Sequence, residues 1–281
     1  MTTLVLSGRG KTGRRVAERL AARGLPVRVG SRSGDPPFDW DRPPTWPLAL
    51  HGVDSVYVAY HPDLAFPTAA RAIGGFAGVA AASGVRRLVM LSRRGEEGAA
   101  LSEGALREAG AEWTIVRASW LSQCFSEGRL LEPVLAGEVA LPARQIGEPF
   151  VDADDVADVA VAALTEEGHD GRVYEVTGPR LLTFAEAVEE IAAAAGREIR
   201  YARISMAEYA SVLARHRVPP IFASLLRYLF AEVLDGRNAH LADGVQRAIG
   251  RKPRDFADYA RAAAASGIWI GINGRRSRPS R

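Results

Sequence analysis

The chain has 281 residues, of which 36 are lysine or arginine and 33 are aspartate or glutamate, so its formal net charge is +3. This length allows a substantial core, and the single cysteine, Cys124, excludes an internal disulfide and a zinc cluster built on cysteines. No run of about 18 apolar residues is present, and Met1 leads directly into a strand without a basic flank. We therefore expect a cytoplasmic protein with no membrane partner and no metal.

The basic residues are spread along the chain instead of clustering on one helix among aromatic residues. All of them except Lys11 and Lys252 are arginines, which indicates a compositional bias and no specific nucleic-acid partner. The segment 274–281 is the exception, because it is polar and basic throughout. We expect this segment to be a disordered tail.

Residues 4–24 combine a strand, a glycine-rich turn and a helix. The apolar residues 4–6 run into Ser7-Gly8-Arg9-Gly10-Lys11-Thr12-Gly13, and a helical pattern then continues to Gly24. Glycine lets the backbone turn sharply and approach a ligand, and the first N–H groups of a helix attract phosphate. Gly8, Gly10 and Gly13 in this context predict a dinucleotide site, in preference to an ordinary tight turn.

The end of the second predicted strand, residues 27–29, indicates which dinucleotide binds. The strand runs into Gly30-Ser31-Arg32-Ser33-Gly34, where an NAD site usually has a carboxylate for the ribose 2′-hydroxyl. Arg32 between two serines suits a 2′-phosphate instead, because the guanidinium fork pairs with phosphate oxygens. We therefore predict NADP(H); the alternative is that Arg32 is a solvated surface arginine.

Strand and helix patterns alternate through the first two-thirds of the chain. Further strands are predicted at residues 54–59, 87–92, 113–117 and 173–176, and helices at about 65–83, at 99–109 and after Asp152. This alternation predicts an α/β fold with a Rossmann-type, doubly wound parallel sheet.

Beyond Gly178-Pro179 the strands largely stop. Thr183 with Glu186 and Ser205 with Glu208 have the spacing of capping boxes, which begin helices. We therefore predict an NADP(H)-binding domain at residues 1–180 and a smaller, mostly helical substrate lobe at residues 181–281. Residues 128–150 are a further candidate for the cleft, which we expect beyond the carboxyl ends of the strands.

These strand ends define the candidate site residues. We expect the cofactor to contact Ser7, Gly8, Gly10, Lys11, Thr12, Gly13, Ser31, Arg32, Ser33, Ala59, Tyr60 and Ser92. The candidate catalytic groups are Tyr60, His61 and Ser92, although His61 is as well explained as a solvent-facing loop histidine. Trp120, Gln123 and Phe150 are expected to line the substrate cleft, with Trp120 and Phe150 as wall or core and not as reacting groups.

A ketone reductase of the short-chain class would add a Tyr-x-x-x-Lys pair, whose lysine lowers the pKa of the tyrosine so that it can donate a proton. No such pair occurs in this chain. Either another group donates the proton or the substrate needs none, as an iminium cation would not. The protein then has to position and polarise the acceptor, while a nicotinamide carries the electron chemistry.

Several segments together resemble one known family. They are Gly10-Lys11-Thr12-Gly13-Arg14-Arg15, Gly84-Val85-Arg86-Arg87-Leu88-Val89-Met90-Leu91-Ser92, Trp113-Thr114-Ile115-Val116-Arg117, Phe150-Val151-Asp152-Ala153-Asp154-Asp155-Val156-Ala157, Tyr174-Glu175-Val176-Thr177-Gly178-Pro179 and Gly250-Arg251-Lys252-Pro253-Arg254-Asp255-Phe256. Over nearly its whole length the chain resembles the NmrA-like branch of atypical short-chain dehydrogenases, and within it the ergot-alkaloid-type reductases and their bacterial relatives. It departs from the family at Ser7, where the first glycine of the motif is usual, and at Ala118, where a proline is usual.

The resemblance implies NADP(H) binding and leaves the reaction open. The family includes reductases of iminium ions, enones and quinones, non-redox cyclases, and regulators that bind the dinucleotide without turning it over. The leading interpretation is an NADPH-dependent reductase of a small hydrophobic acceptor. An NADP(H)-binding redox sensor is the second interpretation, and a cyclase or isomerase on the same fold is the third.

Overall fold

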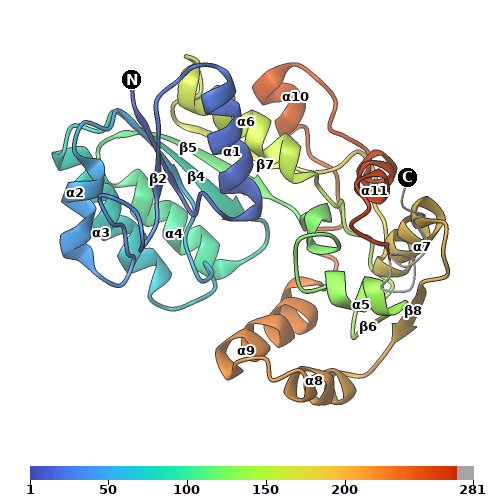
Figure 1. The fold of residues 1–281 in the computed structure, drawn as a ribbon. Helices are drawn as coiled ribbons and strands as arrows, with labels where there is room; N and C mark the ends of the chain where they lie inside the picture. Colours follow the sequence, from blue (N-terminus) through green and yellow to red (C-terminus); the bar gives the residue numbers. More distant parts are fainter. Residues whose placement is uncertain (271–281) are drawn as a thin grey trace, which may run out of the picture. The chain divides into compact units, whose positions relative to one another are not determined.

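The computed structural model describes residues 1–270, which form two compact units (Figure 1). Unit 1 comprises residues 1–119, 153–177 and 242–253, and unit 2 comprises, among the described residues, 120–152, 178–241 and 254–270. The chain thus passes between the units near residues 119, 152, 177, 241 and 253. The basic tail predicted at residues 274–281 lies outside the described residues.

Unit 1 is built on a six-stranded parallel sheet in the order β2-β1-β3-β4-β5-β7. Its strands are β1 (Thr3–Leu6), β2 (Val27–Gly30), β3 (Ser55–Val58), β4 (Arg87–Arg93), β5 (Glu112–Ala118) and β7 (Arg172–Val176). The apolar runs of β1 and β3 are buried along their whole length, as expected for strands covered on both faces. The predicted strands are all present, with ends shifted by no more than one residue.

Helices cover both faces of this sheet, which confirms the Rossmann-type, doubly wound fold. On one face, α2 (Trp46–Leu50), α3 (Ala69–Ala82) and α4 (Glu97–Arg107) pack on a core that includes Leu4, Val56 and Leu88. On the other face, α1 (Lys11–Ala22) and α6 (Ala153–Thr165) are neighbours, joined by an ion pair of 3.2 Å between Arg15 and Asp154. A later helix of the same unit, α10 (Gly244–Ile249), packs against β7 and α6.

Two helices begin at positions other than those predicted. The helix expected from about residue 65 begins at Ala69, because Pro67 has no N–H for the helical ladder. The helix expected at 99–109 begins at Glu97 and ends at Arg107, three residues before Gly110, which has a positive φ of 82°. These shifts leave the strand ends, and therefore the candidate site, where the sequence predicts them.

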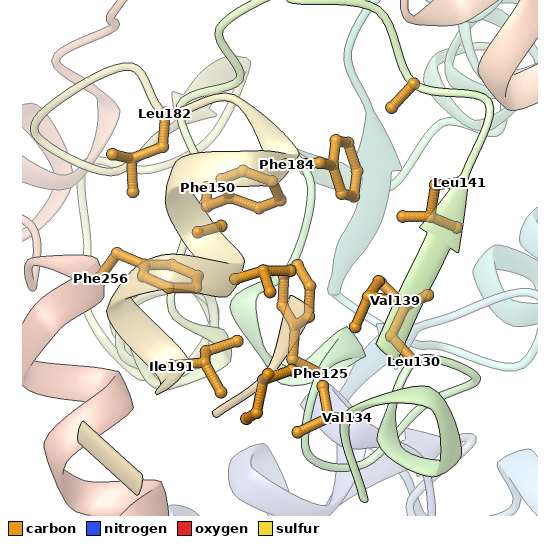
Figure 2. Packing of buried hydrophobic residues seen from close by; sticks show 14 of the residues in the cluster. Phe125, Leu130, Val134, Val139, Leu141, Phe150, Leu182, Phe184, Ile191 and Phe256 are labelled. Carbon is orange, nitrogen blue, oxygen red and sulfur yellow. The ribbon is translucent and has the colours of Figure 1, made fainter. Parts of the chain in front are cut away.

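Unit 2 is mostly helical and has an aromatic core. It contains α5 (Leu131–Ala136), α7 (Phe184–Ala195), α8 (Met206–Arg215), α9 (Pro220–Tyr228), α11 (Phe256–Ala265), the π-helical turn η3 (Leu229–Val233), and a parallel pair of strands, β6 (Glu138–Leu141) and β8 (Arg200–Arg203). Both predicted capping boxes are confirmed, at the starts of α7 and α8. Phe125, Phe150, Phe184 and Phe256 pack around one another in the core (Figure 2). Within residues 1–270, no helix has the length and apolar character needed to span a bilayer.

Candidate functional site

The turn between β1 and α1 is tightly folded on itself. Ser7, the first residue after β1, has a left-handed φ of 53°. Its carbonyl oxygen accepts a hydrogen bond of 2.7 Å from the Gly10 N–H, and its hydroxyl donates one of 2.9 Å to the Ala59 carbonyl after β3. The turn is therefore tied to the neighbouring strand end.

Glycine is required at the third position of the motif by a backbone contact. A Cβ at Gly13 would lie 2.4 Å from the Ser7 carbonyl oxygen, which is closer than real Cβ atoms approach backbone. A Cβ at Gly8 would lie 2.7 Å from the Val29 side chain, and one at Gly10 would lie 3.1 Å from the Ser7 oxygen. The three glycines thus let strand, turn and helix pack closely, as in a dinucleotide-binding turn.

The start of α1 offers uncompensated positive charge. Gly10 is its N-cap and provides no side-chain cap, and its first turn contains no acidic residue. The side chains of Arg9, Lys11 and Arg32 have no hydrogen-bond or ion-pair partner among residues 1–270. Since N–H groups at a helix start and free cations both favour anions, this edge fits the phosphates of a dinucleotide.

The loop after β2 presents Arg32 to solvent. The Ser31 carbonyl oxygen accepts hydrogen bonds from the N–H groups of Gly34 (3.1 Å) and Phe38 (2.8 Å), which closes a turn with Arg32 and Ser33 exposed at its tip. Leu6 and Gly30 are partners in the β1–β2 register, so the loops that carry Arg9 and Arg32 leave the same edge of the sheet. Sequence reasoning missed Arg9, because it occupies a variable position inside the glycine motif.

The two candidate residues after β3, Tyr60 and His61, differ in their surroundings. The Tyr60 ring packs edge-on against Trp40 at 5.0 Å, and its hydroxyl lies 3.5 Å from the Thr68 hydroxyl. His61 is exposed and has no side-chain partner in the part of the chain that the structure describes. Of these two candidate proton donors, only His61 is unconstrained by neighbouring side chains.

Ser92, near the end of β4, is fully buried and belongs to a charged network. Its hydroxyl donates a hydrogen bond of 2.6 Å to Glu103 of α4, which is 1% exposed. Two further hydrogen bonds reach the Glu103 carboxylate from Arg117 of β5, at 2.7 and 2.6 Å. These hydrogen bonds raise the pKa of Arg117 above its ordinary value.

The network continues across the sheet. Ser92 and Arg117 are partners in the β4–β5 register, and Arg117 and Glu175 are partners in the β5–β7 register, so the three side chains share one face. Glu175 accepts hydrogen bonds from Arg117 and from the buried Arg94, both at 3.2 Å. The sequence indicated Ser92 as a site residue but not this network, because Glu103 and Arg107 have the i,i+4 spacing of a solvated helix pair.

The three predicted cleft residues lie in unit 2 and differ in burial. Phe150 is 2% exposed and belongs to the aromatic core. Gln123 is also buried, and its amide donates a hydrogen bond of 2.7 Å to Asp152. Trp120 is half-buried, and its ring contacts Phe184 at 5.0 Å and Phe230 at 5.4 Å. Of the three, Trp120 alone keeps part of its side chain accessible.

Among residues 1–270, no group of three or more His, Cys, Asp or Glu side chains is arranged so that it could hold a metal ion. The only site with the character of a ligand cradle that the predicted residues form is the glycine turn with its free cations.

Sequence comparison defines the family. No family model matches the chain. It is 32% identical over 263 residues to the NAD(P)H azoreductase of Xenophilus azovorans, covering 89% of this chain and 86% of that protein. It is 31% identical over 284 residues to festuclavine synthase II of Penicillium roqueforti, covering 92% and 97% of the two chains. The chain belongs to the NmrA-like atypical short-chain dehydrogenase/reductase family.

Solved structures share its fold. The Citrobacter sp. triphenylmethane reductase complexed with NADP(H) superposes with a TM-score of 0.73 at 20% identity, covering 92% of this chain and 100% of that one. NmrA, a negative transcriptional regulator, superposes with a TM-score of 0.69 at 16% identity, covering 96% and 99%. The departure of this NmrA-like chain at Ser7 has a structural reason: the usual glycine stands where the backbone has a positive φ, which serine tolerates at a cost.

Proposed function

We propose that this protein is an NADPH-dependent reductase that transfers hydride to a small hydrophobic activated acceptor, an imine, an enone or a quinone. The main observation in support of this proposal is that Arg32, which is exposed and has no partner among residues 1–270, lies at the same edge of the sheet as the glycine turn. The name of one relative, an NAD(P)H azoreductase, supports a redox reaction.

In this proposal the chain holds the cofactor by its phosphates. The N–H groups at the start of α1 and the backbone of Gly10 to Gly13 bind the pyrophosphate, since this helix start has neither a side-chain cap nor an acidic residue in its first turn. Arg32 and Arg9, with the hydroxyls of Ser31 and Ser33, bind the 2′-phosphate. The bound nicotinamide supplies the hydride.

The remaining candidate residues act on the acceptor side. The exposed His61 is free to give a proton to a reduced product or to orient it. Tyr60 packs as part of a wall, with Trp40 behind it. The proton of the Ser92 hydroxyl is donated to Glu103, so we assign Ser92 a supporting part through the Glu103–Arg117 network.

The absence of a Tyr-x-x-x-Lys pair limits the acceptors that this set of residues can serve. Plain ketones need a strong proton donor at the developing alkoxide, and the chain has no tyrosine with a lysine four residues later. Activated acceptors need chiefly positioning, which supplies a large share of rate acceleration. We therefore expect simple ketones to be poor substrates.

The deciding experiment is Arg32→Asp with NADPH and NADH titrated separately. The unmodified chain should bind NADPH more tightly by about ten- to a hundredfold, because a hydrogen bond to a charged group contributes roughly 1.5–3 kcal/mol. The variant should lose or reverse this preference, since a carboxylate repels the 2′-phosphate. Arg42→Asp, at another exposed arginine of the following loop, is the charge-matched control and should keep the preference. Equal dissociation constants in the unmodified chain would contradict the proposal.

A redox sensor is the second candidate, favoured by the fold shared with the regulator NmrA. A sensor should distinguish NADP+ from NADPH without consuming either. An enzyme should oxidise NADPH with at least one iminium, enone or quinone acceptor. Tight NADPH binding without oxidation by any of the three acceptor classes would favour the sensor over the reductase.

A further inference from the structure

Unit 2 contains a tryptophan whose polar atom is buried without a partner. Trp120 follows β5 by two residues, and its ring meets Phe184 edge-on at 5.0 Å and Phe230 at an angle of 38° and 5.4 Å. Phe230 in turn meets Tyr209 edge-on at 5.4 Å. The indole thus contacts aromatic rings from α7 and η3, and the Tyr209 ring of α8 packs on Phe230.

The indole N–H of Trp120 differs from those of the two tryptophans that are more deeply buried. Trp46 donates to the Asp39 carbonyl at 2.9 Å, and Trp269 donates to the Phe125 carbonyl at 3.0 Å. Nε1 of Trp120 is buried and has no acceptor anywhere in residues 1–270. The indole nitrogen can only donate a hydrogen bond, and burying a donor without an acceptor costs free energy. We therefore expect this N–H to find an acceptor outside the described residues.

The surroundings of this N–H favour a flat and uncharged ligand. Burial raises the pKa of Tyr209 to about 12, so its phenol adds no charge to the aromatic cluster. In the adjoining helix α9, Leu226 packs on the aromatic core and the Arg129 guanidinium lies 5.1 Å from the centre of the Phe222 ring, whereas Ile221 is exposed. Ile221 therefore exposes an apolar side chain on the helix that leads directly into η3, which carries Phe230.

We propose that the Trp120 indole N–H donates a hydrogen bond to a carbonyl oxygen of the acceptor, while Phe184 and Phe230 pack on its flat face. The acceptor class is then a neutral aromatic carbonyl compound of the quinone type, which extends and rests on the reductase function proposed above. A cationic dye suits the position poorly, because the N–H presents positive charge.

Binding requires a ring to move, since Nε1 is buried. Phe230 is the ring placed to do so, because it lies on the π-helical turn Leu229–Val233. Such turns have an irregular hydrogen-bond pattern and occur frequently at functional sites. The unsatisfied N–H raises the free energy of the closed form, and the acceptor oxygen removes that cost when it binds.

The test is Trp120→Phe, which keeps an aromatic ring and removes the donor. Binding of 1,4-naphthoquinone and of naphthalene to the full chain is measured by calorimetry with NADP+ present, so that no turnover is needed. We expect naphthoquinone binding to weaken about tenfold, as for loss of one hydrogen bond. Naphthalene, which has no oxygen, should change less than twofold. Trp113→Phe, at a half-buried tryptophan of unit 1, should change neither.

Equal losses for the two probes, no loss for either, or no binding of naphthoquinone to the unmodified chain would each overturn the proposal. Selective weakening of a triphenylmethane cation would also overturn it, because the indole face and not its N–H would then be the contact. If the variant does not fold, the indole ¹H–¹⁵N signal of Trp120 in the unmodified chain decides: it should shift downfield with naphthoquinone and not with naphthalene. Tryptophan-dependent quinone binding without NADPH oxidation would refute the reductase function alone.

Discussion

The glycine turn of unit 1 and the aromatic cluster of unit 2 are built by opposite means. The turn consists of the consecutive residues 7–13, and its shape depends on backbone atoms in contact. A Cβ at Gly13 would lie only 2.4 Å from the Ser7 carbonyl oxygen. The cluster consists of Trp120, Phe184 and Phe230, side chains from three distant segments. A site defined by backbone suits a ligand that does not change, such as a cofactor, whereas a site defined by side chains can be altered one ring at a time.

The largest effect should come from placing a side chain in the turn. Gly13→Val puts a Cβ against the Ser7 carbonyl, and neither backbone segment can move without disturbing β1 or α1. We expect a loss of at least about 3 kcal/mol in the free energy of unfolding, together with loss of NADPH binding. Urea unfolding and NADPH titration measure the two effects.

Gly104→Ala in α4 is the matched control for Gly13→Val. A Cβ at Gly104 meets nothing within 4 Å, so the substitution should stabilise the helix by up to about 1 kcal/mol. Similar behaviour of the two variants would mean that the turn is not held by the backbone contact.

The next largest effect should come from the buried network of unit 1. Glu103→Gln removes the charge that faces Arg117, and breaking a buried ion pair costs about 3–5 kcal/mol. We expect about 2–4 kcal/mol here, because Arg117 keeps Glu175 and its side chain is 30% exposed. Glu108→Gln at the end of the same helix has no partner to lose, so it should change stability by less than about 0.5 kcal/mol. Equal unfolding midpoints for the two variants would show that the network is not stabilising.

Ser92→Ala separates a supporting role from a catalytic one. Loss of the hydroxyl that donates to Glu103 should cost about 1.5–3 kcal/mol of stability, as for a hydrogen bond to a charged group. Turnover with a quinone should fall by less than about tenfold if Ser92 only supports the network. A fall of a hundredfold or more would instead identify Ser92 as a proton donor.

The smallest effect should appear in unit 2, as a dependence on pH. Arg180 donates hydrogen bonds of 2.8 and 2.7 Å to Asp255, which hold the pKa of that carboxyl below its ordinary value. A group with a depressed pKa in the folded state stabilises above its unfolded value, about 3.9, and that contribution is lost as pH falls through the folded value. The melting temperature of the unmodified chain should therefore decline below about pH 4 more steeply than that of Asp255→Asn.

Asparagine at position 255 removes the negative charge and keeps the shape of the side chain, so the comparison measures the effect of the charge alone. Asp255 also accepts a hydrogen bond from the Ala257 N–H at the start of α11, and asparagine is an equally good residue for that position. Parallel pH profiles for the two proteins would show that the Arg180 pair contributes nothing to the acid response.

The sequence predicts those parts of the molecule whose structure is determined by residues close together in the chain. The six strands, the glycine turn and both capping boxes were predicted, because each depends on residues within a short window. The parallel pairing of β6 with β8 was missed, since it joins two short strands with some sixty residues between them, and β8 lies in a region expected to be mostly helical. The aromatic cluster was missed except for Trp120, because a phenylalanine in an apolar pattern does not indicate which distant ring it will meet.

Two polar features of unit 1 were not predicted from the sequence, for different reasons. Glu103 has the spacing of a surface ion pair with Arg107, and only the register of β4 and β5 shows that it is buried against Arg117. Arg9 lies within the glycine motif at a position where the motif accepts any residue. Its free guanidinium becomes informative only when the partners of the other arginines are known.

The return of residues 242–253 to unit 1 has a consequence for biosynthesis. Helix α10 packs directly on β7, where a Cβ at Gly244 would lie 2.1 Å from the Glu175 carbonyl oxygen, and Thr177 exchanges hydrogen bonds with the Ala242 backbone. At about 5–20 residues per second, roughly 10–50 s of translation separate β1 from α10. The strands that are synthesised first therefore form before the last segment of their own unit exists. A nascent chain that stalls before this segment leaves β7 without the helix that packs on it, and chaperones can recognise the exposed surface.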